Sequence, residues 1–597
     1  MSLPAIQYTV HAADLDGHRY EVTLRIANPN PAGQVLHMPA WIPGSYLIRD
    51  FSKHIESIAA FLVTDTAETE LQLERIDNDT WKLPQVDLGS VVEIRTTVYA
   101  FDTSVRTAYL DSERGFFNPS SLCLAVEGQT HLPTALAIAP IGTWSVQTTL
   151  SRVKTDAAGF GFYLAPNYDA LLDHPVALGH FQTIDWKSGG TAHSMVIQGC
   201  LQEVDRKRLI TDLSAICDSI IDLFEPKTKR APFQRYLFLV NAVLSGYGGL
   251  EHSDSTALLC NRDHLPQAGC PLNDDHYREF LGLCSHEYIH AWLVKRIQPK
   301  AFQPYDLQSR NHTRLLWLFE GFTSYYDDLL LRRAKLIDDT TYFKLINKTI
   351  NMVLQAPGRQ VQTVAQASFD AWVKYYRQDE NTPNATISYY TKGALVAMCL
   401  DLSMRSEGNA NLDQLMRGLW QRCKGGPLTE ANLLAELQEQ TGRSWQKEIK
   451  AWVHSTQELP LKTLLSSHGV VVHEDPPQMA QRLGLRVAEA QGVVQIKAVL
   501  RGGAAEKAGM AAGDEWWAVA SSKAKSTTWR LKKLEDLTLI LGNEKKAKAT
   551  ITRDQKVFVL DLGVPTDVHT WRLSYTNSDQ AHKARTSAWL DGTSNNA

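Results

Sequence analysis

The feature that most constrains this chain of 597 residues is the run His-Glu-Tyr-Ile-His at positions 286–290. It lies in a stretch from Asp275 to Ile297 whose pattern predicts a helix. Residues four apart lie one turn apart on the same helical face, so the imidazoles of His286 and His290 can reach one metal ion. Glu287 can polarise a water molecule in the open position of such a metal.

Large apolar residues surround this motif and predict that the helix belongs to the core. They are Phe280, Leu281, Leu283, Ile289 and Trp292. Two histidines and a carboxylate facing a core need a metal ion or another partner, because burying unpaired polar groups is costly. The alternative is a surface helix in which these residues occur by chance and bind no metal.

A third metal ligand is available downstream. Glu320 is the only acidic residue between Asp306 and Asp327, and large apolar residues flank it. A buried carboxylate implies a nearby cation. With His286, His290 and a water molecule, Glu320 would make a two-His-one-Glu site with one open position, as in catalytic zinc sites. The alternative is an acid placed near a helix N-terminus because the helix dipole favours it.

Composition limits the class of protein. The chain is too long for a single core, and 44% hydrophobic with 21% charged residues is typical of globular proteins. A net charge of −4 gives no indication of nucleic-acid binding, and no apolar run is long enough to span a membrane. The eight scattered cysteines contain no C-x-x-C pair, and the N-terminus shows no signal peptide. These features predict a cytoplasmic protein with reduced thiols.

The pattern along the chain predicts several domains. Alternating apolar residues over Tyr20–Ile26 and Val92–Val98 indicate strands in a β-rich N-terminal part. The expected organisation is a β-rich domain over 1–180, a zinc catalytic domain over 181–328, a helical domain over 329–460, a module of short strands over 468–564, and a partly disordered tail over 565–597. Within the first domain, the run from Trp41 to Phe51 predicts a rigid, aromatic-braced turn with a local ion pair between Arg49 and Asp50. It could serve architecture or contact a substrate.

Two further motifs carry candidate site residues. Glu251 follows Gly248 and Gly249, and glycine-rich backbone lets another chain approach closely, so Glu251 can offer its carboxylate to a cationic ligand. The alternative is an exposed loop acid. Tyr389 and Tyr390 stand before another predicted helix, and a phenol near zinc can donate a hydrogen bond to a developing oxyanion. Adjacent tyrosines can also serve only for packing.

In this order and combination, the motifs resemble the glycyl aminopeptidase family, zinc metallopeptidases with a C-terminal PDZ domain. The resemblance rests on residues 41–51, 248–252, 286–290 with 295–297, 320–326 and 388–393, and it covers nearly the whole chain. The catalytic half is also similar to the larger thermolysin-like aminopeptidase group. The resemblance implies a multidomain α+β fold with a β-rich N-terminal domain, a thermolysin-like catalytic domain, an α-helical domain and a PDZ-like domain at the C-terminal end.

The resemblance also implies roles for single residues. Glu251, with Gly248 and Gly249, corresponds to the motif whose glutamate binds the free α-amine of the substrate. Tyr390, rather than Tyr389, corresponds to the tyrosine that stabilises the tetrahedral intermediate. Glu320 corresponds to the third zinc ligand, although it lies thirty positions after His290, a wider gap than is usual in the larger group. The run Leu483–Arg486 stands in the place of a carboxylate-binding loop.

The function implied is that of a zinc-dependent aminopeptidase that removes N-terminal glycine or alanine through a zinc-activated water, with one zinc ion per chain. Its partners would be peptides with a free N-terminus, and a peptide ligand for the PDZ-like domain; no nucleic acid or membrane is expected. Three alternatives stay open at this point. They are a zinc endopeptidase, a non-peptidase zinc hydrolase of the same fold, and a non-enzymatic scaffold that works through its PDZ-like module.

Overall fold

A computed structural model describes residues 4–408, 410–521, 527–575 and 580–593. The chain folds into two compact units. The first contains residues 1–311 and 420–428, and the second contains residues 312–419 and 429–597. Each unit is described on its own below.

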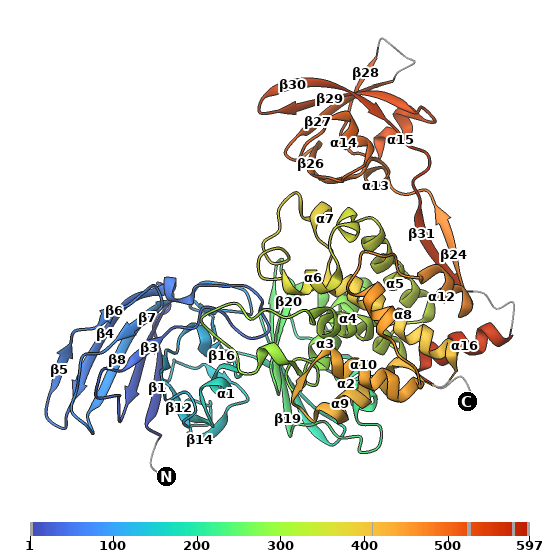
Figure 1. The fold of residues 1–597 in the computed structure, drawn as a ribbon. Coiled ribbons are helices and arrows are strands. Elements are labelled where there is room, and N and C mark those ends of the chain that lie inside the picture. Colours follow the sequence, from blue (N-terminus) through green and yellow to red (C-terminus); the bar gives the residue numbers. More distant parts are fainter. Residues whose placement is uncertain (1–3, 409, 522–526, 576–579, 594–597) are drawn as a thin grey trace. The chain divides into compact units, whose positions relative to one another are not determined.

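The first unit begins with a β-rich domain, which confirms that part of the fold prediction (Figure 1). Its largest sheet has eight strands in the order β14 (Ser151–Thr155), β15 (Gly161–Ala165), β12 (Thr134–Ile138), β1 (Ile6–Asp14), β2 (Arg19–Ile26), β8 (Val91–Tyr99), β4 (Ile55–Val63) and β5 (Glu68–Leu71). A second sheet contains β13 (Ser145–Gln147), β16 (Val176–Gly179), β10 (Arg114–Phe117) and β9 (Ala108–Leu110). A third contains β11 (Ala125–Val126), β3 (Val35–His37), β7 (Thr80–Lys82) and β6 (Glu74–Arg75).

Alternation explains the large sheet. Successive side chains of a strand point to opposite faces, so one face is buried when every second residue is apolar. In β2 the buried residues are Tyr20, Val22, Leu24 and Ile26, and their cross-strand neighbours on β8 include Ile94 and Val98. The short helices η1 (Phe51–His54), η2 (Pro119–Ser121) and α1 (Tyr168–Leu172) complete this domain.

The rest of the first unit is a mixed sheet with helices packed against it. The strand order is β17 (Gln182–Ser188), β18 (Thr191–Gln198), β19 (Arg235–Val243), β21 (Ser255–Asn261) and β20 (Gly248–Glu251), and β20 is an edge strand antiparallel to β21. Helices α2 (Arg206–Phe224) and α3 (Asp274–Ile289) pack on this sheet, and α3 contacts β20 and β21 (Figure 1). The helix η3 (Arg262–His264), the strand pair β22 (Gln298–Pro299) and β23 (Pro427–Leu428), and the helix η4 (Lys300–Phe302) complete the unit.

Helix α3 is shorter than predicted. It begins after Asn273, whose side chain accepts a hydrogen bond from the His276 N–H, and acids occupy its first turn. It ends at Ile289, whereas the sequence predicted a helix as far as Ile297. The chain instead turns at Val294, where φ is +72°, and the Val294 N–H donates to the Ile297 carbonyl over 2.7 Å. The apolar pattern continues through this buried turn, and for this reason the sequence predicted that the helix extends to Ile297.

The second unit contains a helical domain, as predicted. Its helices are α4 (Leu316–Arg333), α5 (Asp339–Leu354), η5 (Pro357–Gln360), α6 (Val364–Phe369), α7 (Thr382–Ala385), α8 (Tyr389–Glu407), α9 (Leu412–Cys423, of which residues 412–419 belong to this unit), α10 (Glu430–Thr441), α11 (Gln446–Trp452) and α12 (Leu461–Ser467). A reciprocal capping box between Thr429 and Asn432 begins α10, and Gly442 in the left-handed conformation ends it.

A sheet module follows in the same unit. It contains β25 (Leu485–Ala490), β26 (Val493–Val499), β27 (Glu515–Ser521), β29 (Lys546–Arg553) and β30 (Lys556–Gly563), with β28 (Thr528–Arg530) paired to β27. The helices α13 (Met479–Leu483), α14 (Ala504–Ala508) and α15 (Asp536–Leu541) accompany the sheet, and Trp516 lies fully buried in its core. The strands β24 (Val470–Asp475) and β31 (Thr570–Tyr575) pair with each other.

The tail after residue 564 is more ordered than predicted over its described part. Besides β31, it contains helix α16 (Gln580–Asp591), where Trp589 and Leu590 are buried. The composition rich in small polar residues suggested disorder, but the burial of Trp589 removes a large apolar area from water, and Arg405 donates to the Ala588 carbonyl over 2.9 Å. Residues 576–579 and 594–597 lie outside the described part of the tail.

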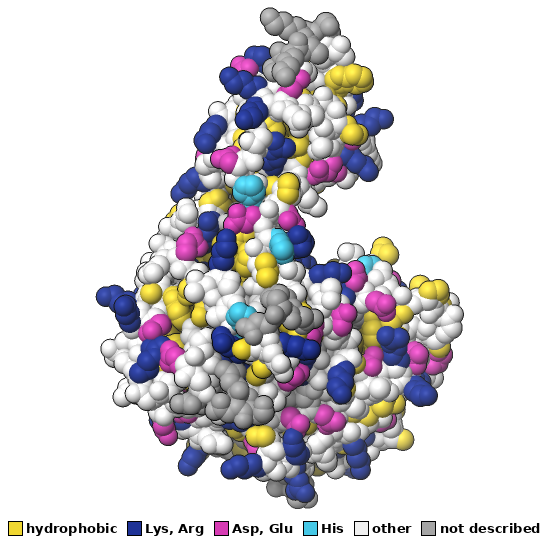
Figure 2. All heavy atoms as spheres, turned by 90° about the vertical axis from the view of Figure 1, so that its right-hand side faces the viewer, with side chains coloured by type: hydrophobic (Ala, Val, Ile, Leu, Met, Phe, Trp, Pro, Cys, Tyr) yellow, Lys and Arg dark blue, Asp and Glu magenta, His cyan; other side chains and the backbone are white. Residues whose placement is uncertain are grey.

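The surface carries both signs of charge. Figure 2 shows Lys and Arg side chains interspersed with Asp and Glu on the face turned to the viewer. All eight cysteines lie among the described residues, and none of them forms a disulfide. Among the residues that the structure describes, no helix is both long and apolar enough to cross a membrane.

Candidate active site

Helix α3 brings two imidazoles together at its C-terminal end. The Nε2 atoms of His286 and His290 lie 3.2 Å apart, and the planes of the two rings are nearly perpendicular, at 85°. Two ligand nitrogens at about 2.0–2.1 Å from a tetrahedral zinc ion would be about 3.3 Å apart. The two nitrogens therefore have the separation that a shared zinc ion requires, and the pair fits the metal expected from the sequence.

The carboxylate of Glu287 lies against the backbone of β20. A Cβ added at Gly249 would be only 2.0 Å from Oε1 of Glu287, so no other residue fits at this position unless the carboxylate moves. Arg106 of the β-rich domain fixes the same strand by donating from Nη2 to the Gly249 carbonyl over 3.0 Å. The sequence predicted that another part of the chain approaches the glycine pair closely, and in the structure this part is the side chain of Glu287. Glu287 is only 5% exposed, as a residue packed against the strand should be.

Glu251 lies two residues further along β20, on the same side of the strand as Gly249. It is 4% exposed, and its Oε1 atom has no hydrogen-bond partner among the described residues. The alternative of an exposed loop acid is wrong, because Glu251 lies in strand β20 and is buried. A buried, unpartnered carboxylate oxygen is a strong acceptor for a cationic ligand.

The turn at Trp41–Phe51 packs directly against Glu251. A Cβ added at Gly44, where φ is +92°, would lie 2.8 Å from both carboxylate oxygens of Glu251. The turn is braced as predicted: the Trp41 indole donates to the Asp306 carbonyl over 2.8 Å, and its ring meets Tyr305 edge-on. The guanidinium of Arg49 donates to Ser45 Oγ over 2.8 Å. The turn therefore covers the carboxylate of Glu251.

In the second unit, Glu320 and Tyr390 lie on helices that cross closely. Glu320 is in the second turn of α4 and is 2% exposed, and Tyr390 is in the first turn of α8. A Cβ added at Gly321 would lie 2.5 Å from the Cα of Gly393, so only a glycine pair allows the two helices to approach this far. This close crossing was not predicted. The sequence does contain a signal for this crossing, because each of the two helical patterns includes a glycine. Glycine is unfavourable inside a helix, so its presence indicates a packing requirement.

The phenol of Tyr390 is held in its protonated form. Burial, followed by the negative charge of Glu320, raises the pKa of Tyr390 well above its ordinary value. Its Oη lies 3.1 Å from Oη of Tyr376, and its ring stacks on Tyr389 at a centroid distance of 4.7 Å. A protonated, positioned phenol is a hydrogen-bond donor, as the oxyanion role requires.

Comparisons with known proteins identify the family of this chain. A model of the Peptidase M61 N-terminal domain matches residues 7–180, and a model of M61 glycyl aminopeptidase matches residues 279–396. The crystal structure of an aminopeptidase N family protein from Idiomarina loihiensis is 35% identical, covers 98% of this chain and 100% of that chain, and has a TM-score of 0.89. An M1 zinc metallopeptidase from Deinococcus radiodurans is 12% identical over 77% of this chain and 96% of that chain, with a TM-score of 0.47. No curated protein matches the chain.

The family models and the Idiomarina loihiensis structure define the class of protein: the chain is a metallo-aminopeptidase, a hydrolase of peptide bonds with an aminopeptidase-like α+β fold. It belongs to the glycyl aminopeptidase family.

Proposed function

We propose that the chain is a zinc-dependent aminopeptidase that removes small N-terminal residues, glycine and alanine, from peptides with a free N-terminus. The observation that carries the proposal is that β20 brings the carboxylate of Glu251 and the contact with Glu287 to the same side of one strand. Glu251 presents an unpartnered oxygen, and Gly249, on the same side of the strand, packs against Glu287. Positions two apart on a strand are about 6.6 Å apart, which leaves room for one residue between a bound ammonium group and the bond to be cut.

In this proposal, His286, His290 and Glu320 hold one zinc ion per chain. The separation of the two Nε2 atoms supports the histidines as ligands of one ion. The deep burial of Glu320 supports it as the third ligand, because an ionised carboxylate at that depth is stabilised by a cation. Such a set leaves one position open for chemistry.

The chain's own residues divide the reaction between them. When bound, the zinc ion would supply a Lewis acid for the peptide carbonyl and lower the pKa of a water molecule. Glu287 takes the proton of that water and delivers it to the leaving amine. Tyr390 donates its hydroxyl proton in a hydrogen bond to the developing oxyanion, and Glu251 holds the substrate ammonium group. The fixed position of Glu251 along β20 limits removal to one residue at a time.

The decisive experiment compares one glycine-initiated peptide with its N-terminus free or acetylated, incubated with the zinc-loaded protein. Cleavage of the free peptide alone, with release of glycine, is the expected result, because acetylation removes the charge that Glu251 would bind. Equal cleavage of both forms would establish an endopeptidase and remove Glu251 from the mechanism. Cleavage of neither form would favour a hydrolase of other small molecules. Peptides beginning with glycine, alanine, leucine or phenylalanine then test the preference for small residues.

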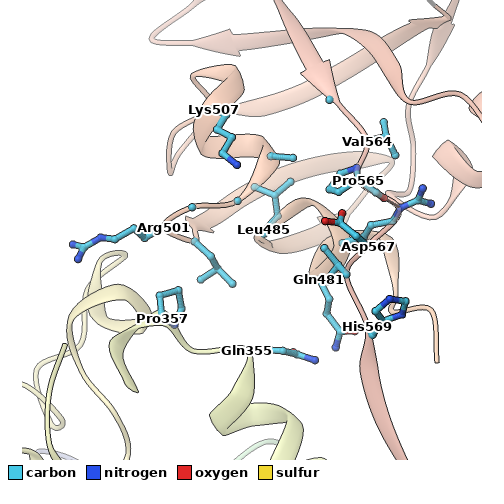
Figure 3. Close-up of a pocket in the computed structure, with 18 of the residues that line it drawn as sticks. Gln355, Pro357, Gln481, Leu485, Arg501, Lys507, Val564, Pro565, Asp567 and His569 are labelled. Atoms are coloured by element: carbon cyan, nitrogen blue, oxygen red, sulfur yellow. Dashed lines mark hydrogen bonds between the residues drawn. The ribbon is translucent and has the colours of Figure 1, made fainter. Parts of the chain in front are cut away.

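We also propose that residues 468–564 form a PDZ-like domain that binds a peptide, and that the other domain boundaries are those predicted above. A cavity of 670 Å³ in the second unit supports a ligand site (Figure 3). It includes Leu485 and Arg486 of the proposed carboxylate-binding loop, and Arg501 and Lys507 supply further positive charge. A peptide with a free C-terminal carboxylate should bind this module more tightly than its C-terminal amide, as fluorescence anisotropy can measure. Equal affinities would contradict carboxylate recognition.

A further inference from the structure

Two cations that follow the metal-binding helix have no part in the chemistry described so far. Lys295 and Arg296 lie in the turn after α3, directly beyond Val294 and its φ of +72°. A positive φ is a genuine outlier for a β-branched residue, and such strain persists where the surrounding structure holds it in place. The turn directs the two side chains toward the loop between β20 and β21, which begins immediately after Glu251.

Arg296 joins that loop to the end of the metal-binding helix. Its Nη1 atom donates both to the Ser253 carbonyl and to the Ala291 carbonyl, each over 2.6 Å. Ser253 lies two residues after Glu251, and Ala291 directly follows His290. One guanidinium nitrogen therefore connects the backbone beside the amine-binding carboxylate with the backbone beside a metal ligand.

Lys295 makes the second connection through Asp173. Its Nζ lies 2.5 Å from Oδ1 of Asp173, and the other oxygen, Oδ2, accepts from the Ser253 N–H over 3.1 Å. Nδ1 of His252 lies 3.4 Å from the same carboxylate. Burial alone would raise the pKa of Asp173, but the Lys295 ammonium group and then His252 hold that pKa well below its usual range. The carboxylate is therefore charged when it binds these three groups.

The loop is not fully packed on the side of these contacts. A cavity of 330 Å³ lies beside these contacts, and its lining includes His252, Ser253, Lys295 and Arg296. Since side chains do not fill this space, the ionic contacts contribute to holding the loop beside it. Ser253 is held from both directions, its carbonyl by Arg296 and its N–H by Asp173.

We propose that Arg296 and the Lys295–Asp173 ion pair are positioning residues that set the spacing between Glu251 and the metal-binding helix, and so fix the number of residues removed. The inference rests on the proposed function, in which Glu251 binds the ammonium group and His290 binds zinc. A displaced Glu251 would bind the substrate ammonium group less tightly and in more than one register, so a spacing of this kind needs rigid support. The plain alternative is that these contacts serve stability only.

The test uses two variants of the full-length, zinc-loaded protein. Arg296→Lys keeps the charge but cannot bridge two carbonyls in the same geometry. The double variant Asp173→Asn with Lys295→Met removes the pair as a whole and leaves no charge buried alone, so folding should survive. Arg235→Lys is the matched control, because Arg235 also joins the β-rich domain to the mixed sheet, donating from Nη2 to the Leu150 carbonyl over 3.1 Å.

The measurements are zinc content, unfolding temperature, kcat and KM for a glycine arylamide, and the products of a glycine-initiated hexapeptide. We expect both test variants to retain zinc, to raise KM about tenfold with a much smaller change in kcat, and to release dipeptides beside free glycine. The Arg235→Lys control should lower only the unfolding temperature. Test variants with the wild-type KM that release glycine alone would overturn the proposal and leave the contacts a purely structural role.

Failure of the proposed function gives a different result. In that case the wild-type protein itself would cleave the acetylated and the free peptide at equal rates. Glu251 would then not bind the substrate ammonium group, and the positioning proposal would be wrong as well. A wild-type protein that requires the free amine, together with test variants of unchanged KM and products, overturns the positioning proposal alone. Failure of the proposed function is therefore seen in the wild-type protein, whereas failure of the positioning proposal is seen only in the test variants.

Discussion

At the level of single residues, three buried glutamates have neighbours that suit them to different tasks. Glu251 has an unpartnered oxygen beside Gly44, Glu287 packs against Gly249, and Glu320 is buried in α4. The motif at 286–290 and the isolated acid Glu320 stand out in the sequence because helical spacing and local composition mark them as candidate ligands. Gly44 and Asp173 could not, because their roles depend on contacts with residues that are distant in the chain.

Glu287→Ala should leave one zinc ion per chain and lower kcat by about 10²–10⁴-fold, because the variant loses proton transfer but no proposed ligand. Metal analysis and steady-state kinetics on the same preparation measure both effects. Loss of zinc from this variant would contradict the division of roles between Glu287 and the two histidines.

Tyr390→Phe should lower kcat about 10²–10³-fold with little change in KM, because an oxyanion donor acts mainly in the transition state. Tyr389→Phe is the matched control, since the two rings stack on each other but only Tyr390 is proposed as the donor. The larger loss in Tyr389→Phe would transfer the role to the neighbouring tyrosine.

At the level of elements, the strands and most helices follow from periodicity, whereas two features do not. The end of α3 at Ile289 depends on the left-handed turn at Val294, a conformation that a β-branched residue gives no reason to expect. The crossing of α4 and α8 depends on Gly321 meeting Gly393, two residues far apart in the chain. Periodicity identifies which face of an element is apolar, but not which element will cover it.

Gly393→Ala tests this crossing. A Cβ there would lie 2.5 Å from the Trp317 carbonyl, so the helices must move apart. We expect a loss of about 1–3 kcal/mol in the free energy of unfolding, although alanine is about 1 kcal/mol more favourable than glycine in a helix interior. The loss should appear in urea unfolding, with a lower kcat because Tyr390 moves. Unchanged or greater stability would show that the crossing tolerates the methyl group.

The contact between β18 and α3 predicts a pH dependence. His193 is buried, its Nδ1 lies 3.0 Å from the Thr191 carbonyl, and its Nε2 lies 2.8 Å from the Tyr288 hydroxyl. Burial lowers the pKa of His193 to about 4 from 6.5. Because the unfolded chain takes up the proton first, the stability that His193 contributes is complete above pH 6.5 and is lost as the pH falls toward 4.

The size of this loss is about 3 kcal/mol, from the difference between the two pKa values. Urea unfolding at intervals from pH 7.5 to 4 should show it, superimposed on the titration of the carboxylates. His193→Gln removes the titrating group and should flatten this part of the profile even if its stability at pH 7.5 is lower. Equal slopes in the two proteins would assign the dependence to other groups.

At the level of the whole molecule, the β-rich and helical domains follow from the change of period along the chain, and the family follows from motifs in a fixed order. The packed helix α16 in the tail was not predicted, because composition alone does not show that Trp589 finds a core. Composition describes a segment by itself, whereas packing depends on the rest of the chain.

Removal of zinc should lower the stability of the whole protein. A ligand that binds only the folded state adds about 2.7 kcal/mol when its free concentration is one hundred times its Kd. Chelator-treated protein should therefore unfold at a lower temperature than zinc-loaded protein in calorimetry, and added zinc should restore the difference. The variant His290→Ala should unfold at the same temperature with and without zinc. A chelator effect that persists in this variant would place the stabilising ion elsewhere.

The position of Asp173 has a consequence for how such a protein can change over generations. This aspartate follows α1 in the β-rich domain, yet it binds Ser253 and Lys295 of the mixed-sheet region. A gene that lost or exchanged the segment for the first domain would also lose the carboxylate that holds the loop after Glu251. The two regions are therefore expected to be inherited together, and a successful recombinant must supply an acid at this position.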